Sequence, residues 1–174
     1  MPTQFDLCFA KLMQVEGLYS NDPSDKGGQT KYGISTPIAR EYGITPEQLK
    51  ELSIEDAKAI YCGKFYSALC LDTINNLDFA YELFEMAVNQ GLTQAIKALQ
   101  TAYSVVANDI AIDGKFGEQT KVAIFYASEF PEQAAIMTKI INVIQGQRYI
   151  DICLRSPNQR KFLRGWLTRV YCER

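Results

Sequence analysis

The sequence predicts a predominantly α-helical protein of 174 residues. Apolar residues recur at three- and four-residue intervals through most of the chain, which is the periodicity of amphipathic helices. Helix-start signals precede several of these segments, and evidence for strands is confined to one early loop. The length allows one domain or two small ones, and no apolar run reaches the roughly 18 residues that a membrane-spanning helix needs.

The first element is an amphipathic helix at the start of the chain. Its apolar stripe consists of Phe5, Cys8, Phe9, Leu12 and Met13. Glu16 continues this stripe, so we expect its carboxyl group at the edge of the core, and Gly17 provides a natural stop. The stretch 16–35 that follows is rich in glycine and aspartate, and residues 32–35 are a candidate strand of a small β-hairpin.

Two helix starts in the middle of the chain have clear capping signals. Thr45 is an N-cap candidate, with Pro46 at the first helical position and Gln48 at the third, so a short helix to about residue 52 is expected. Ser53, with Asp56 three residues on, begins the next helix, whose apolar stripe continues to about residue 69.

The remaining apolar patterns predict five further helices, at 79–89, 92–106, 118–128, 131–154 and 159–171. Gly91 ends the first of them, and the best domain boundary lies near this glycine. A turn at 110–117 separates the second from the third. In the helix at 118–128 we expect Val122, Phe125 and Tyr126 to face inward.

Residue usage excludes several kinds of catalytic site. The chain has no histidine, which rules out Ser-His and Cys-His nucleophilic sites and zinc sites that contain histidine. Its five cysteines are odd in number and form no C-x-x-C pair, so neither a disulfide framework nor a cysteine-only zinc site is expected. We therefore expect chemistry based on carboxylates, hydroxyls, lysines or arginines, with no metal and no cofactor.

Charge is distributed unevenly along the chain. Residues 1–90 hold 7 basic and 13 acidic side chains, whereas residues 91–174 hold 11 and 7. The basic excess concentrates near the end of the chain at helical spacings, which is typical of a solvated helix face and also compatible with a polyanion partner. With a net charge of −2 and no DNA-binding motif, we expect no nucleic-acid partner.

The stretch 16–35 is the best candidate for a site. A carboxylic acid on a rigid element, facing a polar glycine-rich loop with the further carboxylates Asp22 and Asp25, suits the cleavage of a glycosidic bond. The same composition is also compatible with a surface loop after a helix, because Gly, Asn, Asp and Pro are ordinary turn residues.

The sequence of this stretch, EGLYSNDPSDKGGQTKYGIS, resembles the opening signature of the glycoside hydrolase family 108 N-acetylmuramidases. It departs from the usual family pattern at Leu18 and Ser20. Three later segments extend the resemblance over nearly the whole chain: FEMAVNQG at 84–91, DGKFGEQT at 113–120 and FLRGWLTRV at 162–170.

The resemblance implies a lysozyme-like α+β catalytic half with a small β-hairpin over residues 1–90, followed by a helical peptidoglycan-binding half over residues 91–174. It also implies an enzyme that cleaves the β-1,4 bond between N-acetylmuramic acid and N-acetylglucosamine in peptidoglycan. By direct motif match, Glu16 is the general acid. Its place at the edge of an apolar helix face would keep it protonated near neutral pH.

The second carboxylate is less defined. Asp25 lies nine residues after Glu16, as in phage-type lysozymes, and Thr30 matches the threonine that follows in them. Asp22 is the alternative, although it could instead cap the turn before Pro23.

The groove for the glycan is expected to involve Tyr19, Asp22, Tyr32 and Asn89. Aromatic faces pack on sugar rings and amides bond hydroxyl and N-acetyl groups. The two tyrosines could equally belong to the core, with their hydroxyls at its rim.

The start of the chain shows no basic segment followed by an apolar one, so we expect synthesis in the cytoplasm without a signal peptide. Members of the family that the chain resembles act as phage endolysins and as secretion-linked muramidases. We accordingly expect action on the cell wall after export, with a holin-like partner, by a monomer. The alternative is a non-catalytic wall-binding protein on the same fold.

Overall fold

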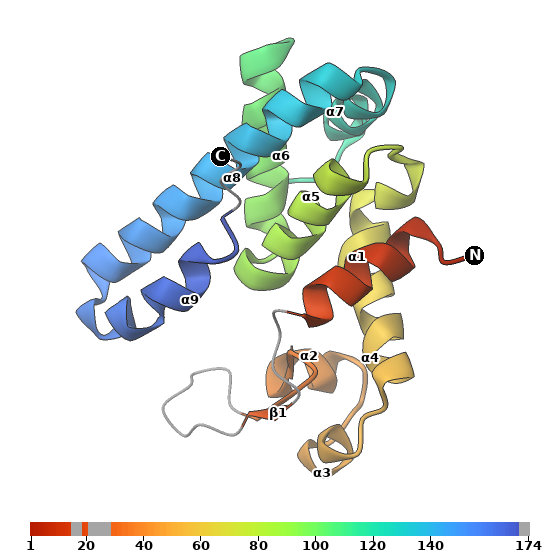
Figure 1. Ribbon diagram of the computed structural model, residues 1–174, viewed down its shortest axis with the longest axis vertical. Coiled ribbons are helices and arrows are strands. Elements are labelled where there is room, and N and C mark those ends of the chain that lie inside the picture. Colours follow the sequence, from red (N-terminus) through yellow and green to blue (C-terminus); the bar gives the residue numbers. More distant parts are fainter. Residues whose placement is uncertain (15–18, 21–28, 171–174) are drawn as a thin grey trace. The chain divides into compact units, whose positions relative to one another are not determined.

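The computed structural model describes residues 1–14, 19–20 and 29–170, the pair 19–20 by its backbone alone. It confirms the predominantly α-helical class with a small antiparallel sheet (Figure 1). The chain divides into two compact units, Met1–Ala68 and Leu69–Arg174. Each unit has its own buried apolar core, so each is described by itself.

The first unit combines short helices with a three-stranded sheet. Its elements are α1 (Gln4–Met13), β1 (Tyr19–Ser20), β2 (Thr30–Lys31), β3 (Ile34–Ser35), α2 (Thr36–Glu41), α3 (Pro46–Lys50) and α4 (Ile54–Tyr61). A π-helical turn, Cys62–Tyr66, continues directly from α4. The predicted helix at 53–69 therefore changes its hydrogen-bonding pattern after Tyr61.

Helix α1 is held at its start by a capping box. The Thr3 hydroxyl accepts a bond from the Asp6 N–H, and the Asp6 carboxylate accepts one from the Thr3 N–H. Cys8, Phe9 and Leu12 are buried, as the stripe predicts. The helix ends at Met13 with Gln14 as its C-cap, before Glu16, to which the sequence analysis had extended the stripe.

The capping signals in the middle of the chain are confirmed. Thr45 and Gln48 form a reciprocal capping box at the start of α3, and the Ser53 hydroxyl accepts a bond from the Asp56 N–H at the start of α4. Both signals depend only on residues three apart, so the local sequence suffices to specify them.

Two local features of this unit differ from the prediction. Helix α2 had not been predicted, although Pro37 stands in its first turn, a common position for proline at a helix start. In the segment 32–35, only Ile34 and Ser35 form a strand, because Tyr32 and Gly33 make the turn that joins β2 to β3.

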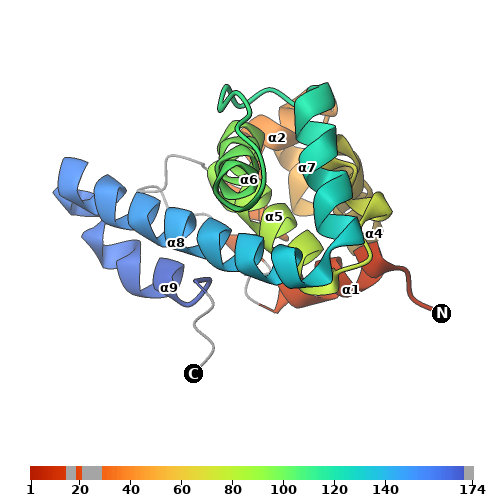
Figure 2. The same cartoon turned by 90° about the horizontal axis from the view of Figure 1, so that it is seen from above.

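The second unit is a helical assembly. Its elements are a 3₁₀ turn at Leu71–Thr73, α5 (Leu77–Gln90), α6 (Leu92–Val106), α7 (Glu118–Glu129), α8 (Pro131–Arg155), a 3₁₀ segment at Pro157–Phe162 and α9 (Leu163–Leu167). Helices α5, α6 and α8 pack on one another and form its core, α7 packs on α6 and α8, and α9 lies along α8 (Figure 2).

Two predictions for this unit are wrong. Val122 and Phe125 are 50% and 64% exposed, because α7 instead buries Thr120, Ala123, Ile124 and Ala127. Small alanines allow α7 to approach its neighbours more closely than the bulky face would. The helix predicted at 159–171 is a 3₁₀ segment followed by the short α9, in which Trp166 stacks on Tyr149 with ring centroids 5.3 Å apart.

Among the described residues, no helix is long and apolar enough to cross a membrane.

Candidate active site

The predicted catalytic residues fall into two groups in the structure. Glu16, Asp22 and Asp25 lie outside the described residues, as does the side chain of Tyr19. Thr30, Tyr32 and Asn89 are described, the first two in the sheet region of the first unit and the third on α5 of the second. The structure therefore defines the elements that flank the predicted catalytic stretch.

The described parts of that stretch form the three-stranded sheet. Strand β2 pairs antiparallel with β1 on one side and with β3 on the other, in the order β1-β2-β3. Thr30 lies in the central strand, opposite Ser20 and Ser35, and Tyr19 pairs with Lys31. Residues 21–28, which include Asp22 and Asp25, thus connect the paired strands β1 and β2.

The turn between β2 and β3 places Tyr32 in an unusual backbone conformation. Its φ is 50° and that of Gly33 is 77°, and this pair of positive values is typical of the two-residue turns that match the twist of a hairpin. A non-glycine residue in this region costs about 1 kcal/mol. Lys31 lies with its Nζ 5.3 Å from the centre of the Tyr32 ring.

A buried tyrosine fixes this turn to the helical part of the unit. The Tyr61 hydroxyl, on α4, donates a 3.0 Å hydrogen bond to the backbone carbonyl of Tyr32. Tyr61 is 1% exposed, and its ring packs against Phe9 of α1 and Phe65. The strained turn is therefore held by a hydrogen bond from the core, which is what keeps such a conformation in place.

Gln29 anchors the chain where it enters β2. Its backbone carbonyl accepts bonds from both the N–H and the hydroxyl of Thr36, each at 3.1 Å. Its side-chain amide donates to the carbonyl of Pro46 at 3.2 Å. The residue that follows the stretch 21–28 is thereby tied to the starts of α2 and α3.

Asn89, the predicted substrate residue of the second unit, is exposed and oriented by a buried glutamate. Its amide nitrogen donates to the backbone carbonyl of Glu85 at 3.0 Å and to Glu85 Oε1 at 2.7 Å. Glu85 is only 2% exposed, and Arg169 donates to the same Oε1 at 3.1 Å while Gln145 donates to Oε2. The Glu85 carboxylate therefore has a cationic partner and several donors, as a buried charge requires.

The same cluster affects a neighbouring phenol. Burial, followed by the negative charge of Glu85, raises the pKa of Tyr149 to about 12. Tyr149 therefore stays neutral through the physiological range and stacks on Trp166 as an apolar surface.

The segment DGKFGEQT forms a turn whose polar groups are bonded within the protein. Gln100, 2% exposed on α6, donates to Asp113 Oδ1, the Lys115 carbonyl and the Thr120 hydroxyl, and accepts from the Gly114 N–H. Hydrogen bonds from the Lys115 N–H and from Gln100 lower the pKa of the Asp113 carboxyl. The segment is thus a turn between α6 and α7 that hydrogen bonds from Gln100 hold in place.

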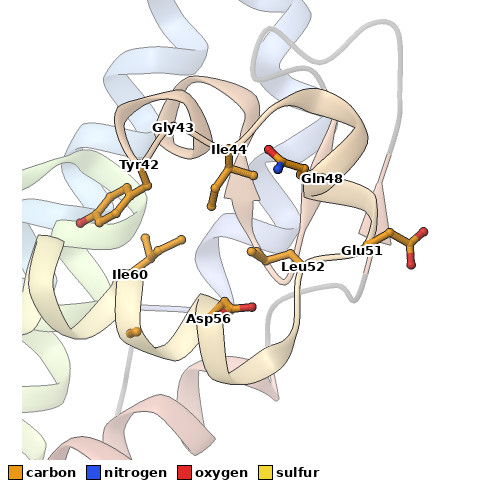
Figure 3. A pocket seen from close by; sticks show the side chains of 9 residues that line it. Tyr42, Gly43, Ile44, Gln48, Glu51, Leu52, Asp56 and Ile60 are labelled. Atoms are coloured by element: carbon orange, nitrogen blue, oxygen red, sulfur yellow. The ribbon is translucent and has the colours of Figure 1, made fainter.

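A separate cavity lies in the first unit between the end of α2, α3 and α4 (Figure 3). Ile44, Leu52 and Ile60 supply apolar lining, and Gln48 and Asp56 supply polar groups. The Glu51 side chain points outward (Figure 3). Of the predicted site residues that the structure describes, Thr30, Tyr32 and Asn89, none lines this cavity. Within the described part of the chain, no group of three potential ligands is placed to hold a metal ion.

The comparisons with known proteins assign the class of the protein. Residues 9–91 match the glycosyl hydrolase 108 family, and residues 94–171 match the family described as a predicted peptidoglycan domain. The first part of the chain therefore belongs to the glycosyl hydrolase 108 family, and the second part is a peptidoglycan domain. The protein is a glycoside hydrolase that acts on peptidoglycan.

The structure of SagA from Brucella abortus has the same fold. It matches with a TM-score of 0.76 and 21% sequence identity, over 95% of this chain and 88% of that one. The comparison with curated proteins gave no match.

The family matches and the compact units divide the chain at different places. The two matches meet between residues 91 and 94, whereas the second compact unit begins at Leu69 and includes α5. Asn89 therefore lies within the glycosyl hydrolase match but in the compact unit that contains the peptidoglycan domain.

Sequence analysis assigned no role to the groups that orient these residues. Tyr61, Glu85 and Arg169 act through contacts 29 to 84 residues apart in the chain, which no local pattern reports. The only available signal was that Glu85 and Arg169 lie in two of the segments that resemble family motifs.

Proposed function

We propose that the protein is an N-acetylmuramidase that cleaves the β-1,4 bond between N-acetylmuramic acid and N-acetylglucosamine, with Glu16 as general acid. The single observation that carries this proposal is the glycosyl hydrolase 108 match over residues 9–91, which includes the whole stretch 16–35. Protonation of the leaving oxygen by a carboxylic acid is the common requirement of such cleavage. In this proposal residues 1–90 form the catalytic region and residues 91–174 bind peptidoglycan.

Asp25 is the proposed second carboxylate, with Thr30 beside it and Asp22 as the alternative. The pairing of β1 with β2 supports this assignment, because it places Ser20, directly before the stretch 21–28, opposite Thr30, which follows the stretch by two residues. A carboxylate at this place would direct water or stabilise the developing positive charge. A separation from Glu16 of about 6.5–9.5 Å would give inversion, and about 5–5.5 Å would give retention.

Tyr19, Asp22, Tyr32 and Asn89 are the proposed substrate contacts. The conformation of Tyr32 supports a role outside the core, because its side chain is half-buried while its backbone is held in a costly turn. For Asn89, the amide nitrogen bonds Glu85, so the side-chain carbonyl oxygen is the group that would accept a bond from a sugar hydroxyl or an N-acetyl N–H.

The central test is Glu16→Gln, assayed on purified sacculi. We expect clearing to fall by at least about 100-fold, the usual contribution of a general acid, with an unchanged unfolding transition. Muropeptides with a reducing N-acetylmuramic acid end, identified by mass spectrometry in the wild-type digest, would confirm the bond. Release of a different reducing end, or full activity in Glu16→Gln, would contradict the proposal.

Asp25→Asn and Asp22→Asn form a matched pair for the second carboxylate. We expect the larger loss of turnover in Asp25→Asn, measured as the rate of reducing-end release. The reverse order would transfer the role to Asp22.

For the biological setting, we propose that the enzyme reaches the wall after export, in phage-type lysis or in secretion-linked wall remodelling, with a holin-like partner. The match to a peptidoglycan domain supports action at the wall. Expression in a bacterial host with and without a holin tests this proposal: lysis that requires the holin would support the lysis role.

A further inference from the structure

Helix α8 has apolar residues on two opposite faces. One face is buried in the second unit and includes Ala134, Met137, Ile141, Gln145, Tyr149 and Cys153. The opposite face, here called the outer stripe, consists of Ile136, Ile140, Val143, Gln147, Ile150 and Leu154. No charged residue lies in the outer stripe, whereas a solvated helix face normally carries charges.

The outer stripe is open to solvent. Ile136 is 46% exposed, Val143 71%, Ile150 43% and Leu154 68%. Single exposed apolar residues are ordinary, but a contiguous row of them is a typical sign of an interaction surface. Figure 2 shows that the short α9 lies beside the C-terminal part of this 25-residue helix and does not extend along its N-terminal part.

The spacing within the outer stripe is that of a coiled-coil seam. Its six members follow one another at intervals of 4, 3, 4, 3 and 4 residues. This is the heptad pattern, with Ile140, Gln147 and Leu154 at the a positions and Ile136, Val143 and Ile150 at the d positions. Over the 18 residue steps from first to last, a helix rises about 27 Å.

The stripe is also symmetric about Gln145. Its members lie 9, 5 and 2 residues before this position and 2, 5 and 9 residues after it. A closed two-fold dimer requires such a self-complementary surface. In an antiparallel pair, Ile136 would lie opposite Leu154 of a second copy, Ile140 opposite Ile150, and Val143 opposite Gln147, so that each a position meets a d position.

From this spacing and symmetry, we propose that a second copy of the chain packs on the outer stripe, with the two α8 helices antiparallel. The antiparallel arrangement also opposes the two helix dipoles favourably. Gln147, the one polar member, would lie opposite Val143, and its amide nitrogen is already bonded to Asp151 Oδ1 at 2.9 Å. This dimer replaces the monomer that the sequence analysis expected, and it does not depend on the proposed catalytic residues.

The test compares two matched substitutions by sedimentation equilibrium of the full chain. Val143→Glu places a charge in the seam, whereas Val105→Glu places it on α6 at a valine of similar exposure, 67%. We expect wild type and Val105→Glu to reach twice the 19.6 kDa chain mass as concentration rises. Val143→Glu should weaken dimerisation by about 100-fold or more, because a carboxylate would have to be buried.

A compensating pair of changes tests the orientation. Ile150→Glu alone should weaken the dimer, and Ile140→Lys/Ile150→Glu should restore it, because an antiparallel pair brings these two charges together. In a parallel pair, like charges would meet and the double variant would stay dissociated, which would overturn the antiparallel arrangement. A wild-type mass of one chain at every concentration, or an intact dimer in Val143→Glu, would overturn the proposal itself.

Discussion

At the scale of single residues, Gln100 shows how one buried side chain can specify a loop. It bonds to Asp113, Gly114, Lys115 and Thr120, and so satisfies polar groups on the turn between α6 and α7 from one position. Each such bond contributes about 1 kcal/mol, but leaving a buried partner unbonded costs more. The turn is therefore a structural unit of the peptidoglycan domain.

Gly114 in this turn should not tolerate a side chain. Its φ is 74°, and an added Cβ would lie 2.8 Å from Thr93 Cγ2 and 3.1 Å from the Thr93 carbonyl oxygen. We expect Gly114→Ala to lower the free energy of unfolding by about 1–3 kcal/mol, measured by chemical denaturation. Gly117→Ala is the control, because its φ is −111° and an added Cβ would meet nothing within 4 Å. Equal effects at both positions would contradict this explanation.

The residues that orient the predicted substrate contacts Tyr32 and Asn89 could not be predicted from sequence, for a physical reason. Tyr61 is predictable as a buried aromatic from its helical spacing, but its hydroxyl bonds a carbonyl 29 residues earlier, and only the folded chain brings the two together. In the sequence, Glu85 is likewise only a charged residue within an apolar helix. Its role becomes visible when the folded chain places Arg169 beside it. Sequence patterns report local periodicity, whereas these roles depend on distant contacts.

At the scale of elements, the ion pair between Glu85 of α5 and Arg169 fastens the segment after α9 to the core of the second unit. The Arg169 side chain is 14% exposed and that of Glu85 is 3% exposed. Removing one partner of such a pair leaves a buried charge without compensation, which is costly. The FEMAVNQG and FLRGWLTRV segments therefore meet physically.

We expect Arg169→Gln to lower the free energy of unfolding by about 2–4 kcal/mol, because the Glu85 carboxylate would lose its cation. Arg169→Lys, which keeps the charge, should recover part of this loss. Arg164→Gln, at an exposed position of α9, should have little effect. Thermal or chemical unfolding of the three variants checks this order, and a loss in Arg164→Gln as large as in Arg169→Gln would exclude a specific role for the ion pair.

The start of α1 should show a pH-dependent contribution. A hydrogen bond from Lys58 of α4, followed by those from Thr3, lowers the pKa of Asp6 to about 2. Because the folded pKa is depressed below its usual value near 4, the ionised carboxylate stabilises the fold above that value, and this contribution is lost as pH falls towards 2. We expect wild type to be more stable than Asp6→Asn near pH 6, and the difference to shrink over this range. A difference that does not change with pH would refute the assignment.

Most elements of the fold could be predicted because their signals are local. The capping residues Thr45 and Ser53 and the helix stop at Gly91 all lie where the sequence indicates. The inward face of α7 could not be predicted, because both its alanine face and its bulky face have helical spacing. Packing against α6 and α8 selected the small residues.

At the scale of the whole molecule, the family matches and the compact units assign α5 differently. The glycosyl hydrolase match includes α5, but its buried face packs on α6 and α8, within the second unit. The predicted boundary near Gly91 coincides with the end of α5 and with the end of the glycosyl hydrolase match. The compact units divide earlier, between Ala68 and Leu69. Helix periodicity marks the ends of helices and does not tell which neighbours a helix packs against.

This difference predicts how fragments of the chain behave. A fragment of residues 69–174 should fold cooperatively, because it keeps the three core helices of the second unit. A fragment of residues 92–174 lacks α5 and should expose the faces of α6 and α8 that α5 buries. Circular dichroism during thermal unfolding checks this, and a cooperative transition in the shorter fragment would show that α5 is dispensable for the core.

The backbone of Tyr32 has a consequence for adaptation to heat. Asparagine and glycine accept its φ of 50° more readily than tyrosine does, so either replacement offers a short route to a more thermostable enzyme. If the ring serves the glycan, that gain would be exchanged for weaker catalysis. The residue found at this position in heat-adapted enzymes would then show whether selection has favoured thermostability or catalysis.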